Sequence, residues 1–336
     1  MYGHDDKTKK TMKYIGIDIS KRSFTVAFSS ENGSPVREYE NSPKGIHKFI
    51  SALSSDAVCV MEATGNYGTM LVYLLQESGF KMIVENPLKV KNFARAMMSV
   101  TKTDAIDARL LALYGERMQP SLYHVPGREL LLLKQKRTVL RQLKKQLTMS
   151  KNLWESIDVL PFVDPLVKKT MKSTIKYLEK EIKRIEESLA SYTEEIFSQQ
   201  FKLLTSVKGI GATLAVALIV ATGAFTSFDN SKQLTKYLGL SPTYEQSGTS
   251  VLHRGHINRN GDSELRSQLY VAAWSAVQYN PTCKALYTRL RQKGKPGKLA
   301  MIAVANKLVR IAFSVVKNNV PYDINYSLTS LERNNA

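Results

Sequence analysis

Two acidic residues in the first third of the sequence lie inside or at the end of apolar segments, and two more form a closely spaced pair. Asp18 lies within the run 14–19, and Glu62 ends a second such run. Asp104 and Asp107 are three residues apart, so on a helix they share one face. Because carboxylates repel one another and resist burial, four of them directed at one point favour a divalent cation. Oxygen ligands suit Mg²⁺ or Mn²⁺, and two such ions about 4 Å apart hold the attacking and leaving oxygens of a phosphodiester.

Each acid also has a purely structural interpretation. Asp18 has Lys13 and Lys21 nearby in sequence as ion-pair partners. Glu62 is a polar residue at a strand end, which is common. The later pair of aspartates would complement the dipole at a helix N-terminus. Spacing alone therefore leaves the metal site and these simpler roles open.

A glycine-rich turn in the second half is a candidate phosphate contact. Lys208-Gly209-Ile210-Gly211 precedes an apolar helix and has the form of a helix–hairpin–helix turn. Its glycines let backbone N–H groups approach a phosphate at the positive end of a helix. The alternative is a tight connection between two helices. We assign Lys208, Gly209 and Gly211 to nucleic-acid binding.

A polar loop at about 240–260 carries serines beside glycines. Most such serines form turns, and a nucleophilic serine needs a base or a metal, which nothing local supplies. His253 and His256 make a weak zinc signal, so we interpret them as phosphate contacts or surface residues. Three arginines around the loop suit a scissile phosphate: Arg254, Arg259 and Arg266.

The composition points to a polyanionic partner. The 336-residue chain has a net charge of +19 and a pI of about 9.7, and phosphate binding would make its affinity salt-dependent. Lys and Arg are concentrated in 128–151, which holds one acid, and in 284–310, which holds none. The remaining lysines assigned to nucleic-acid contact are Lys102, Lys293, Lys295 and Lys298.

Two cysteines, Cys59 and Cys283, have no metal-type neighbours and make no disulfide framework, which fits a reducing cytoplasm. The polar segment 1–13 does not resemble a signal peptide. The longest apolar stretch, 214–221, is too short to span a bilayer. We therefore expect a cytoplasmic protein with no membrane partner.

The pattern of elements indicates an α/β part followed by an all-α part, with about two or three domains. A meander followed by alternating helices and strands predicts a mixed sheet in the first part. The expected strands are 13–19, 23–29, 35–40, 57–61 and 81–85, and the expected helices are 43–53, 67–78, one from Pro87, and 104–118. We place the domains at 1–122, 123–198 and 199–336, with later helices at 261–279 and 297–318.

The middle of the chain carries a heptad pattern. Apolar residues recur every seven positions from Leu133 to Trp154, and in alternating steps of four and three from Met171 to Tyr192. This favours two long helices that form an antiparallel hairpin or an intermolecular coiled coil. An ordinary face of a helical bundle gives a similar pattern.

In order, these motifs resemble the DEDD-type transposases of bacterial insertion sequences, whose relatives include Piv-type DNA invertases. The N-terminal motifs are Gly16-Ile17-Asp18, Met61-Glu62-Ala63-Thr64-Gly65, Glu85-Asn86-Pro87 and Lys102-Thr103-Asp104-Ala105-Ile106-Asp107. The C-terminal motifs are Val207-Lys208-Gly209-Ile210-Gly211, Gly239-Leu240-Ser241-Pro242, Ser247-Gly248, Arg259-Asn260-Gly261-Asp262 and a basic helix around Lys307 and Arg310.

The resemblance implies an RNase H-like, RuvC-type N-terminal domain whose four acidic positions are Asp18, Glu62, Asp104 and Asp107. It further implies a coiled-coil connector and a C-terminal transposase domain with a catalytic serine at Ser247. Where the family often has two serines before the glycine, this chain has Gln246, so Ser241 and Ser250 stay alternatives. Better-studied members are guided by a structured RNA from the ends of their element.

We therefore expect a Mg²⁺-dependent recombinase that mobilises an insertion sequence through a covalent phosphoserine intermediate. It would act as a homo-oligomer, a dimer or tetramer, on the element's junction and its target DNA. A RuvC-like resolvase that uses the acids alone would leave free DNA ends instead. A sugar-kinase-like ATPase is disfavoured because Ser20-Lys21-Arg22 lacks the expected glycine. An architectural DNA-binding protein would leave the four acids unexplained.

Overall fold

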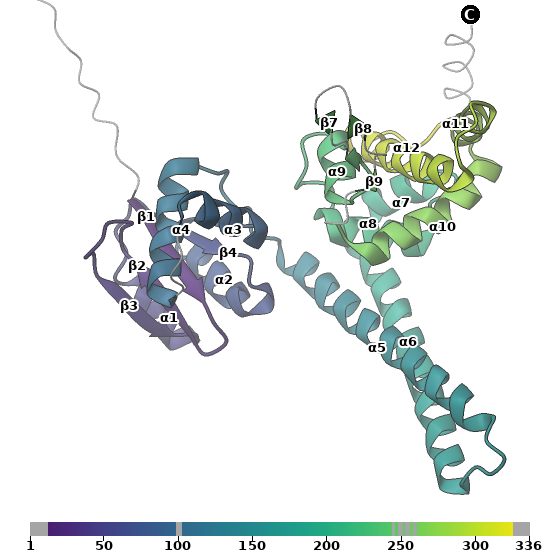
Figure 1. Ribbon diagram of the computed structural model, residues 1–336, viewed down its shortest axis with the longest axis horizontal. Coiled ribbons are helices and arrows are strands. Elements are labelled where there is room, and N and C mark those ends of the chain that lie inside the picture. The colour runs from purple at the N-terminus through teal and green to yellow at the C-terminus, as the bar shows by residue number, and fades with distance from the viewer. Residues whose placement is uncertain are drawn as a thin grey trace, which may run out of the picture. The chain divides into compact units, whose positions relative to one another are not determined.

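The computed structural model describes residues 13–98, 103–243, 246–247, 251–252, 256–257 and 261–324, and it describes no side chains within 242–260. The chain forms two compact units, Met1–Val125 and Pro126–Ala336 (Figure 1). The expected three-domain division stays a prediction.

A five-stranded mixed sheet organises the first unit. Its strands are β1 (Lys13–Ile19), β2 (Ser23–Ala27), β3 (Val36–Glu40), β4 (Ala57–Glu62) and β5 (Lys81–Glu85), in the order β3-β2-β1-β4-β5. The first three form an antiparallel meander, while β4 is parallel to both β1 and β5. The central strands are buried on both faces, which matches their nearly continuous apolar sequences. This arrangement is consistent with the expected RNase H-like domain.

Helices cover both faces of this sheet. They are α1 (Pro43–Ile50), the short 3₁₀ helix η1 (Gly65–Gly68), α2 (Thr69–Glu77), α3 (Pro87–Ala96) and α4 (Asp104–Met118). Ile46 of α1 and Leu71 of α2 belong to one apolar cluster, whereas Val90 of α3 and Leu111 of α4 belong to another. The side chains of Ser42, Asn86 and Thr103 cap α1, α3 and α4.

Helix α4 packs directly on the backbone of β1. A Cβ atom added to Gly16 would overlap the carbonyl oxygen of Ala108 and the backbone nitrogen of Ala112. At Gly115, an added Cβ would lie 2.6 Å from the Tyr14 ring. These contacts show that α4 runs antiparallel to β1, so its N-terminus lies at the carboxyl end of the strand.

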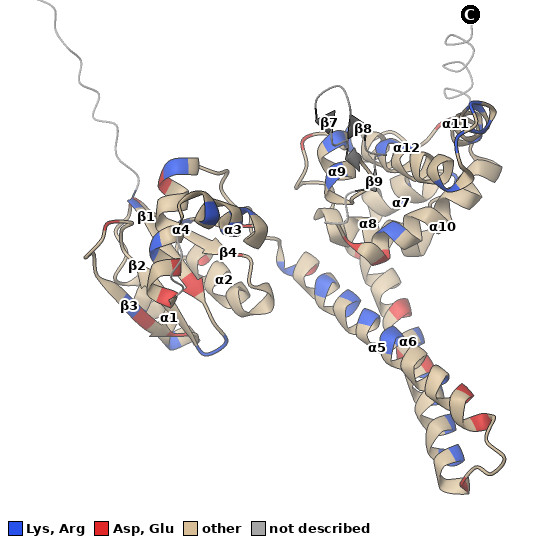
Figure 2. Cartoon of the chain, in the orientation of Figure 1, with Lys and Arg blue, Asp and Glu red and all other residues tan. Residues whose placement is uncertain are grey.

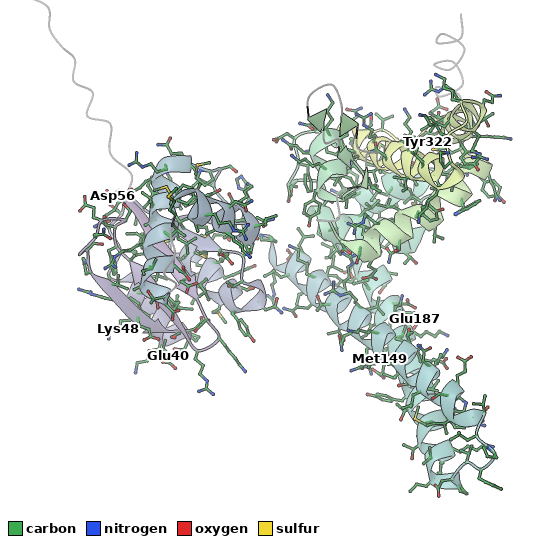
Figure 3. The ribbon with its side chains drawn as sticks, in the orientation of Figure 1. Glu40, Lys48, Asp56, Met149, Glu187 and Tyr322 are labelled. Carbon is green, nitrogen blue, oxygen red and sulfur yellow. The ribbon has the colours of Figure 1, made fainter. Side chains whose placement is uncertain are left out.

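The second unit begins with two long helices, α5 (Arg128–Asp158) and α6 (Pro165–Ile196). Lys144 pairs with Glu186 at 2.6 Å, and Lys151 pairs with Glu179 at 2.7 Å. Because the partner number falls as the residue number rises, the helices are antiparallel. Of the alternatives that the heptad pattern left open, the structure shows the hairpin within one chain. Its distal half still exposes apolar side chains, such as Met149, labelled in Figure 3.

The rest of this unit is a helical bundle with two small strand pairs. Its helices are α7 (Ser198–Ser206), α8 (Ala212–Thr222), α9 (Ser231–Tyr237), α10 (Ser263–Tyr279), α11 (Pro281–Gln292) and α12 (Gly297–Asn318). The strands are β6 (Pro242–Thr243), β7 (Gln246–Ser247), β8 (Val251–Leu252) and β9 (His256–Ile257). Leu218, Leu269 and Leu308 are fully buried in the shared core.

Helix α12 is long and apolar enough to cross a membrane by length and composition alone. Half of its most apolar window is buried inside the unit, where it contributes Val304 and Leu308 to the core. That burial is typical of the core helix of a globular protein, and the composition of α12 is weak evidence for a membrane segment.

We predict that Gly16→Ala destabilises the first unit by about 3 kcal/mol, at the upper end of the range for overpacking, because the opposing atoms are backbone. Urea unfolding checks this. The matched control is Gly68→Ala, whose added Cβ would meet the flexible end of Ile19 at 3.2 Å and should cost less than about 1 kcal/mol. Equal stability of the two variants would contradict the packing argument.

Candidate active site

The first two acids lie side by side at one edge of the sheet. In the parallel pair β1–β4, Ile17 is opposite Met61, so Asp18 and Glu62 occupy the next positions on the two strands. Both side chains are partly buried. The carboxyl ends of neighbouring parallel strands are where open α/β sheets bind ligands.

The other two acids reach the same edge from α4. Asp104 begins the helix and Asp107 lies in its first turn, while the Thr103 hydroxyl accepts a hydrogen bond from the N–H of Ile106 at 3.3 Å. Asp107 directly precedes Ala108, which packs on Gly16 two residues before Asp18. The acidic segments gather at the lower end of α4 in Figure 2.

Carboxylates suit a hard divalent cation, so the donor set fits Mg²⁺ or Mn²⁺. Within the described part of the chain, however, no group of three or more His, Cys, Asp or Glu side chains is close enough to hold an ion. Asp104 is exposed, while Asp107 is partly buried. The sheet edge therefore brings the four acids to one side of the unit, and their convergence on one ion stays a prediction.

Glu85 is a fifth acid at this edge, and sequence reasoning gave it no role. It is opposite Glu62 in the β4–β5 register and is buried. It accepts hydrogen bonds from the Asn86 N–H and the Tyr114 hydroxyl, both at 2.8 Å, and pairs with Lys89 at 3.0 Å. Burial pushes its pKa up, but these partners outweigh burial and hold the pKa below the ordinary 4.5.

The bonds of Glu85 have a structural consequence. The Tyr114 hydroxyl comes from α4, so the bond ties that helix to the end of β5. Burial, followed by the hydrogen bond to Glu85, raises the pKa of Tyr114 to about 12, so the phenol stays a donor at neutral pH. We interpret Glu85 as a residue that positions α4. The only sequence signal was its place in the Glu85-Asn86-Pro87 motif.

The candidate serine lies in a small β-ribbon of the second unit, formed by strands β6 to β9 and called the serine ribbon below. Strand β7, which contains Ser247, pairs with β8. Strand β6, before them in the chain, pairs with β9, which follows them. The side chain of Ser247 lies outside the described residues, as do Ser250, Arg254, Arg259 and Lys102. Ser241 is partly buried, and its hydroxyl lies 3.4 Å from the Thr235 hydroxyl.

Packing fixes both ends of the ribbon. At its start, the Asn306 side chain donates to the Leu240 carbonyl at 3.3 Å. At its end, a Cβ on Gly261 would lie 2.5 Å from the Tyr237 carbonyl oxygen, so only glycine fits there. Asp262 follows and caps α10 by accepting from the N–H groups of Glu264 and Leu265.

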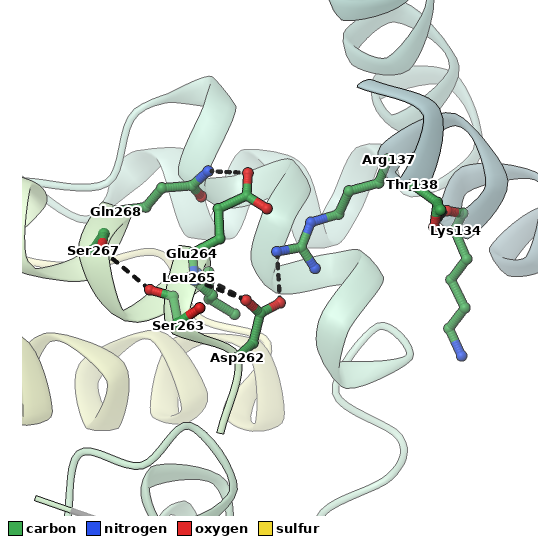
Figure 4. A network of polar contacts seen from close by, with 9 residues as sticks. All are labelled: Lys134, Arg137, Thr138, Asp262, Ser263, Glu264, Leu265, Ser267 and Gln268. Atoms are coloured by element: carbon green, nitrogen blue, oxygen red, sulfur yellow. Dashed lines mark hydrogen bonds and ion pairs between the residues drawn. The ribbon is translucent and has the colours of Figure 1, made fainter. Parts of the chain in front are cut away.

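An ion pair joins that cap to the hairpin. The Arg137 guanidinium donates to Asp262 at 2.9 Å, and the two side chains are 16% and 25% exposed (Figure 4). Burial pushes the pKa of Asp262 up, but the Leu265 N–H, the charge of Arg137 and further hydrogen bonds hold it below the ordinary 3.8. The start of α5 is thus fastened to the end of the serine ribbon. The sequence gave no signal for a pair 125 residues apart.

The glycine-rich turn connects α7 to α8 as expected. Gly209 has φ +107°, and an added Cβ would lie 2.7 Å from the Ala276 side chain, so the turn requires glycine here. No side chain caps α8 at Gly211, and Lys208 is exposed. The N-terminal N–H groups of α8 are the ones that a phosphate would meet. Lys293, Lys295 and Lys298 are also exposed, around the α11–α12 connection.

Comparison with known proteins gives the chain its family. Residues 201–288 match the family described as "Transposase IS116/IS110/IS902 family", and residues 15–159 match a family described as "Transposase". The pilin gene-inverting proteins of Moraxella bovis and Moraxella lacunata are 33% and 32% identical over 322 residues, 92% of this chain and 97% of each relative. The transposase for insertion sequence element IS1111A of Coxiella burnetii is 23% identical over 94% of this chain and 93% of its own length.

The chain therefore belongs to the IS110 family of transposases and is a DNA transposase or recombinase. The resemblance seen in the sequence motifs is confirmed. Membership implies DNA as a partner and site-specific recombination of insertion sequences as the activity.

We predict that Arg137→Met lowers the free energy of unfolding of the second unit by about 2 kcal/mol, between the values for exposed and buried pairs. Because the pKa of folded Asp262 is depressed, the contribution is present at neutral pH and is lost as pH falls below 3.8. Urea unfolding of wild type and variant at several pH values measures this. Lys144→Met is the control, since its pair with Glu186 is more than 40% exposed and should contribute about 0.5 kcal/mol. A gap that persists in strong acid would contradict the assignment.

Proposed function

We propose that this recombinase cleaves and rejoins DNA at the ends of a mobile element through a serine nucleophile assisted by the carboxylate edge. The observation that carries the proposal is the crossing of α4 over β1 at Gly16, which brings the first turn of α4 to the strand ends that bear Asp18 and Glu62. Purely structural acids would need no such arrangement. The family supplies the substrate class, DNA.

Asp18, Glu62, Asp104 and Asp107 would hold Mg²⁺ or Mn²⁺. A divalent cation at this edge supplies charge neutralisation for the scissile phosphate and its leaving oxygen. By holding the cation there, the acids would place its charge beside the scissile phosphate. Glu85 keeps α4 in place by accepting a hydrogen bond from the Tyr114 hydroxyl at 2.8 Å.

Ser247 would be the nucleophile. Its Oγ forms a bond to phosphorus as the bond from phosphorus to one deoxyribose oxygen breaks. The hydroxyl proton passes to a carboxylate, and the departing oxygen takes up a proton. The phosphoserine link conserves the energy of the phosphodiester, so rejoining needs no ATP. Arg254 and Arg259 would neutralise the phosphate. The acids and Ser247 belong to different units, so the units must meet, within one chain or between two.

The partners that we propose are element-junction and target DNA, a structured guide RNA, and further copies of this chain, as a dimer or tetramer. The net charge of +19 and the basic segments 128–151 and 284–310 support binding of nucleic acid. Lys102, which precedes the Asp104 motif in sequence, would add a cation that contacts the nucleic-acid backbone. We place the protein in the cytoplasm, where its DNA substrate lies.

The hairpin end supports self-association. Val159, Phe162 and Leu166, between and at the start of the two long helices, are 79%, 91% and 72% exposed. Large apolar side chains gathered at one end of a helical hairpin mark an interaction surface. A second copy presents the same surface, and a symmetric contact buries both.

The serine mechanism predicts one covalent product. Wild-type protein with junction DNA and Mg²⁺ should become attached to DNA at Ser247, which peptide mass spectrometry identifies. Ser247→Ala should bind the same DNA and form neither adduct nor recombinant, and Asp18→Asn should also lose recombination while retaining binding. Strand cleavage by Ser247→Ala that leaves free ends would favour a metal-dependent nuclease, for which the carboxylate edge within one unit suffices.

Self-association predicts that Phe162→Ser lowers the mass measured by light scattering and leaves thermal unfolding unchanged, because the side chain is exposed. The control is Tyr177→Ser, whose side chain is 62% exposed away from the hairpin end and should leave the mass unaltered. Ile182 is unsuitable for this test, because it is 8% exposed within the hairpin. An unchanged mass for Phe162→Ser would place the oligomer contact elsewhere.

A further inference from the structure

A cavity lined by cationic side chains lies in the second unit, and no residue of strands β6 to β9 lines it. It has a volume of about 540 Å³ and lies between α12, the N-terminus of α11 and the segment 320–323. Tyr322, labelled in Figure 3, anchors that segment, because its N–H donates to the Ser206 hydroxyl at 2.9 Å. This hydrogen bond holds one wall of the cavity in place, while the cavity itself is open to solvent.

One side of α12 supplies the charge. Lys307, Arg310 and Ser314 line the cavity and follow one another at spacings of three and four residues, so they form a stripe on one helix face. Among the described residues, no ion pair involves either cation. The lining also includes one acid, the exposed Asp323. The two cations outnumber it.

The start of α11 adds a donor. Thr282 lines the cavity, and its hydroxyl oxygen is buried with no hydrogen-bond partner. A buried polar group without a partner costs stability, so its retention calls for an explanation. Burial raises the pKa of the neighbouring Cys283 to about 11, and the charge of Lys307 acts in the opposite direction. Lys307 therefore lies near the positive end of α11.

A buried asparagine links this cavity to the glycine-rich turn. Asn280, 1% exposed, donates to the Lys208 carbonyl at 3.3 Å. Its Oδ1 accepts from the Cys283 N–H at 3.2 Å and from the Tyr322 hydroxyl at 3.0 Å. The turn, the start of α11 and the cavity wall thus share one polar residue. A nucleic-acid strand that contacts the turn would have the cavity close by.

We propose that this cavity binds a backbone phosphate of a nucleic-acid strand. Lys307 and Arg310 neutralise the phosphate, and the Thr282 hydroxyl donates to one of its oxygens. The volume exceeds that of a phosphate alone, so the adjoining sugars also fit. The proposal rests on nucleic acid as the family's partner and not on the serine mechanism.

Thr282→Val gives the sharpest test, since it keeps the side-chain shape and removes the unpaired hydroxyl. The variant should unfold at the same or a higher temperature than wild type, yet bind a fluorescein-labelled DNA duplex about tenfold more weakly at low salt. Arg310→Gln should reduce the slope of log affinity against log salt by about one unit. Asp323→Asn should tighten binding.

Lys317→Met is the control, because Lys317 is on the same helix, lies over the Phe313 ring and does not line the cavity. Lys317→Met should weaken binding of the DNA duplex less than Arg310→Gln does. Acetylation of Lys307, read by mass spectrometry, should be suppressed by the duplex and not by inorganic phosphate at equal phosphate concentration. Unchanged affinity and salt slope in Thr282→Val and Arg310→Gln would overturn the proposal, as would equal protection by free phosphate.

Discussion

The first unit depends on one contact between backbones. Helix α4 lies directly on β1 because position 16 has no side chain, and an alanine there would overlap the Ala108 carbonyl. That approach fixes both the direction and the height of α4 over the sheet. It brings a first turn that carries two aspartates to the strand ends that carry Asp18 and Glu62. The Tyr114–Glu85 bond holds the same helix at a second point, on β5.

In the second unit, two polar residues, the partly buried Asp262 and the buried Asn280, connect separate elements. Asp262 ends the serine ribbon, caps α10 and binds Arg137 of the hairpin, so three elements meet at one carboxylate. Asn280 joins the glycine-rich turn to α11 and to the chain after α12. Removing the partner of a buried polar group lowers the stability of the folded protein. Such residues therefore hold their elements in one arrangement.

Much of this architecture was readable from the sequence. The limits of β1, β5, α4 and α12 agree with those expected, because each element has a clear apolar period or a distinct boundary residue. Helices α9 and α11 were missed. The first has only seven residues, and the second reads as part of a basic stretch. The sequence also could not show whether the apolar face of the heptad pattern packs within one chain or against another. Spacing identifies the apolar face of a helix but not the chain that covers it.

Some residues of the candidate site could be identified from the sequence, and others could not. The four acids could be named from their settings and from the family motifs, whereas Glu85 could not, since a polar residue at a strand end is common. The role of Asp262 came from its ion pair with Arg137, and that of Thr282 came from the cavity that it lines with Lys307 and Arg310. Such contacts follow from tertiary packing and leave no local pattern.

The central claim is that the carboxylate edge holds divalent cations. It is tested most directly by electron paramagnetic resonance of Mn²⁺ titrated into Ser247→Ala protein bound to junction DNA, where cleavage does not deplete the complex. The account predicts saturable Mn²⁺ binding that is lost when Asp18→Asn is added and retained with Glu38→Gln, an exposed acid on β3. Equal Mn²⁺ binding by the two double variants would contradict it.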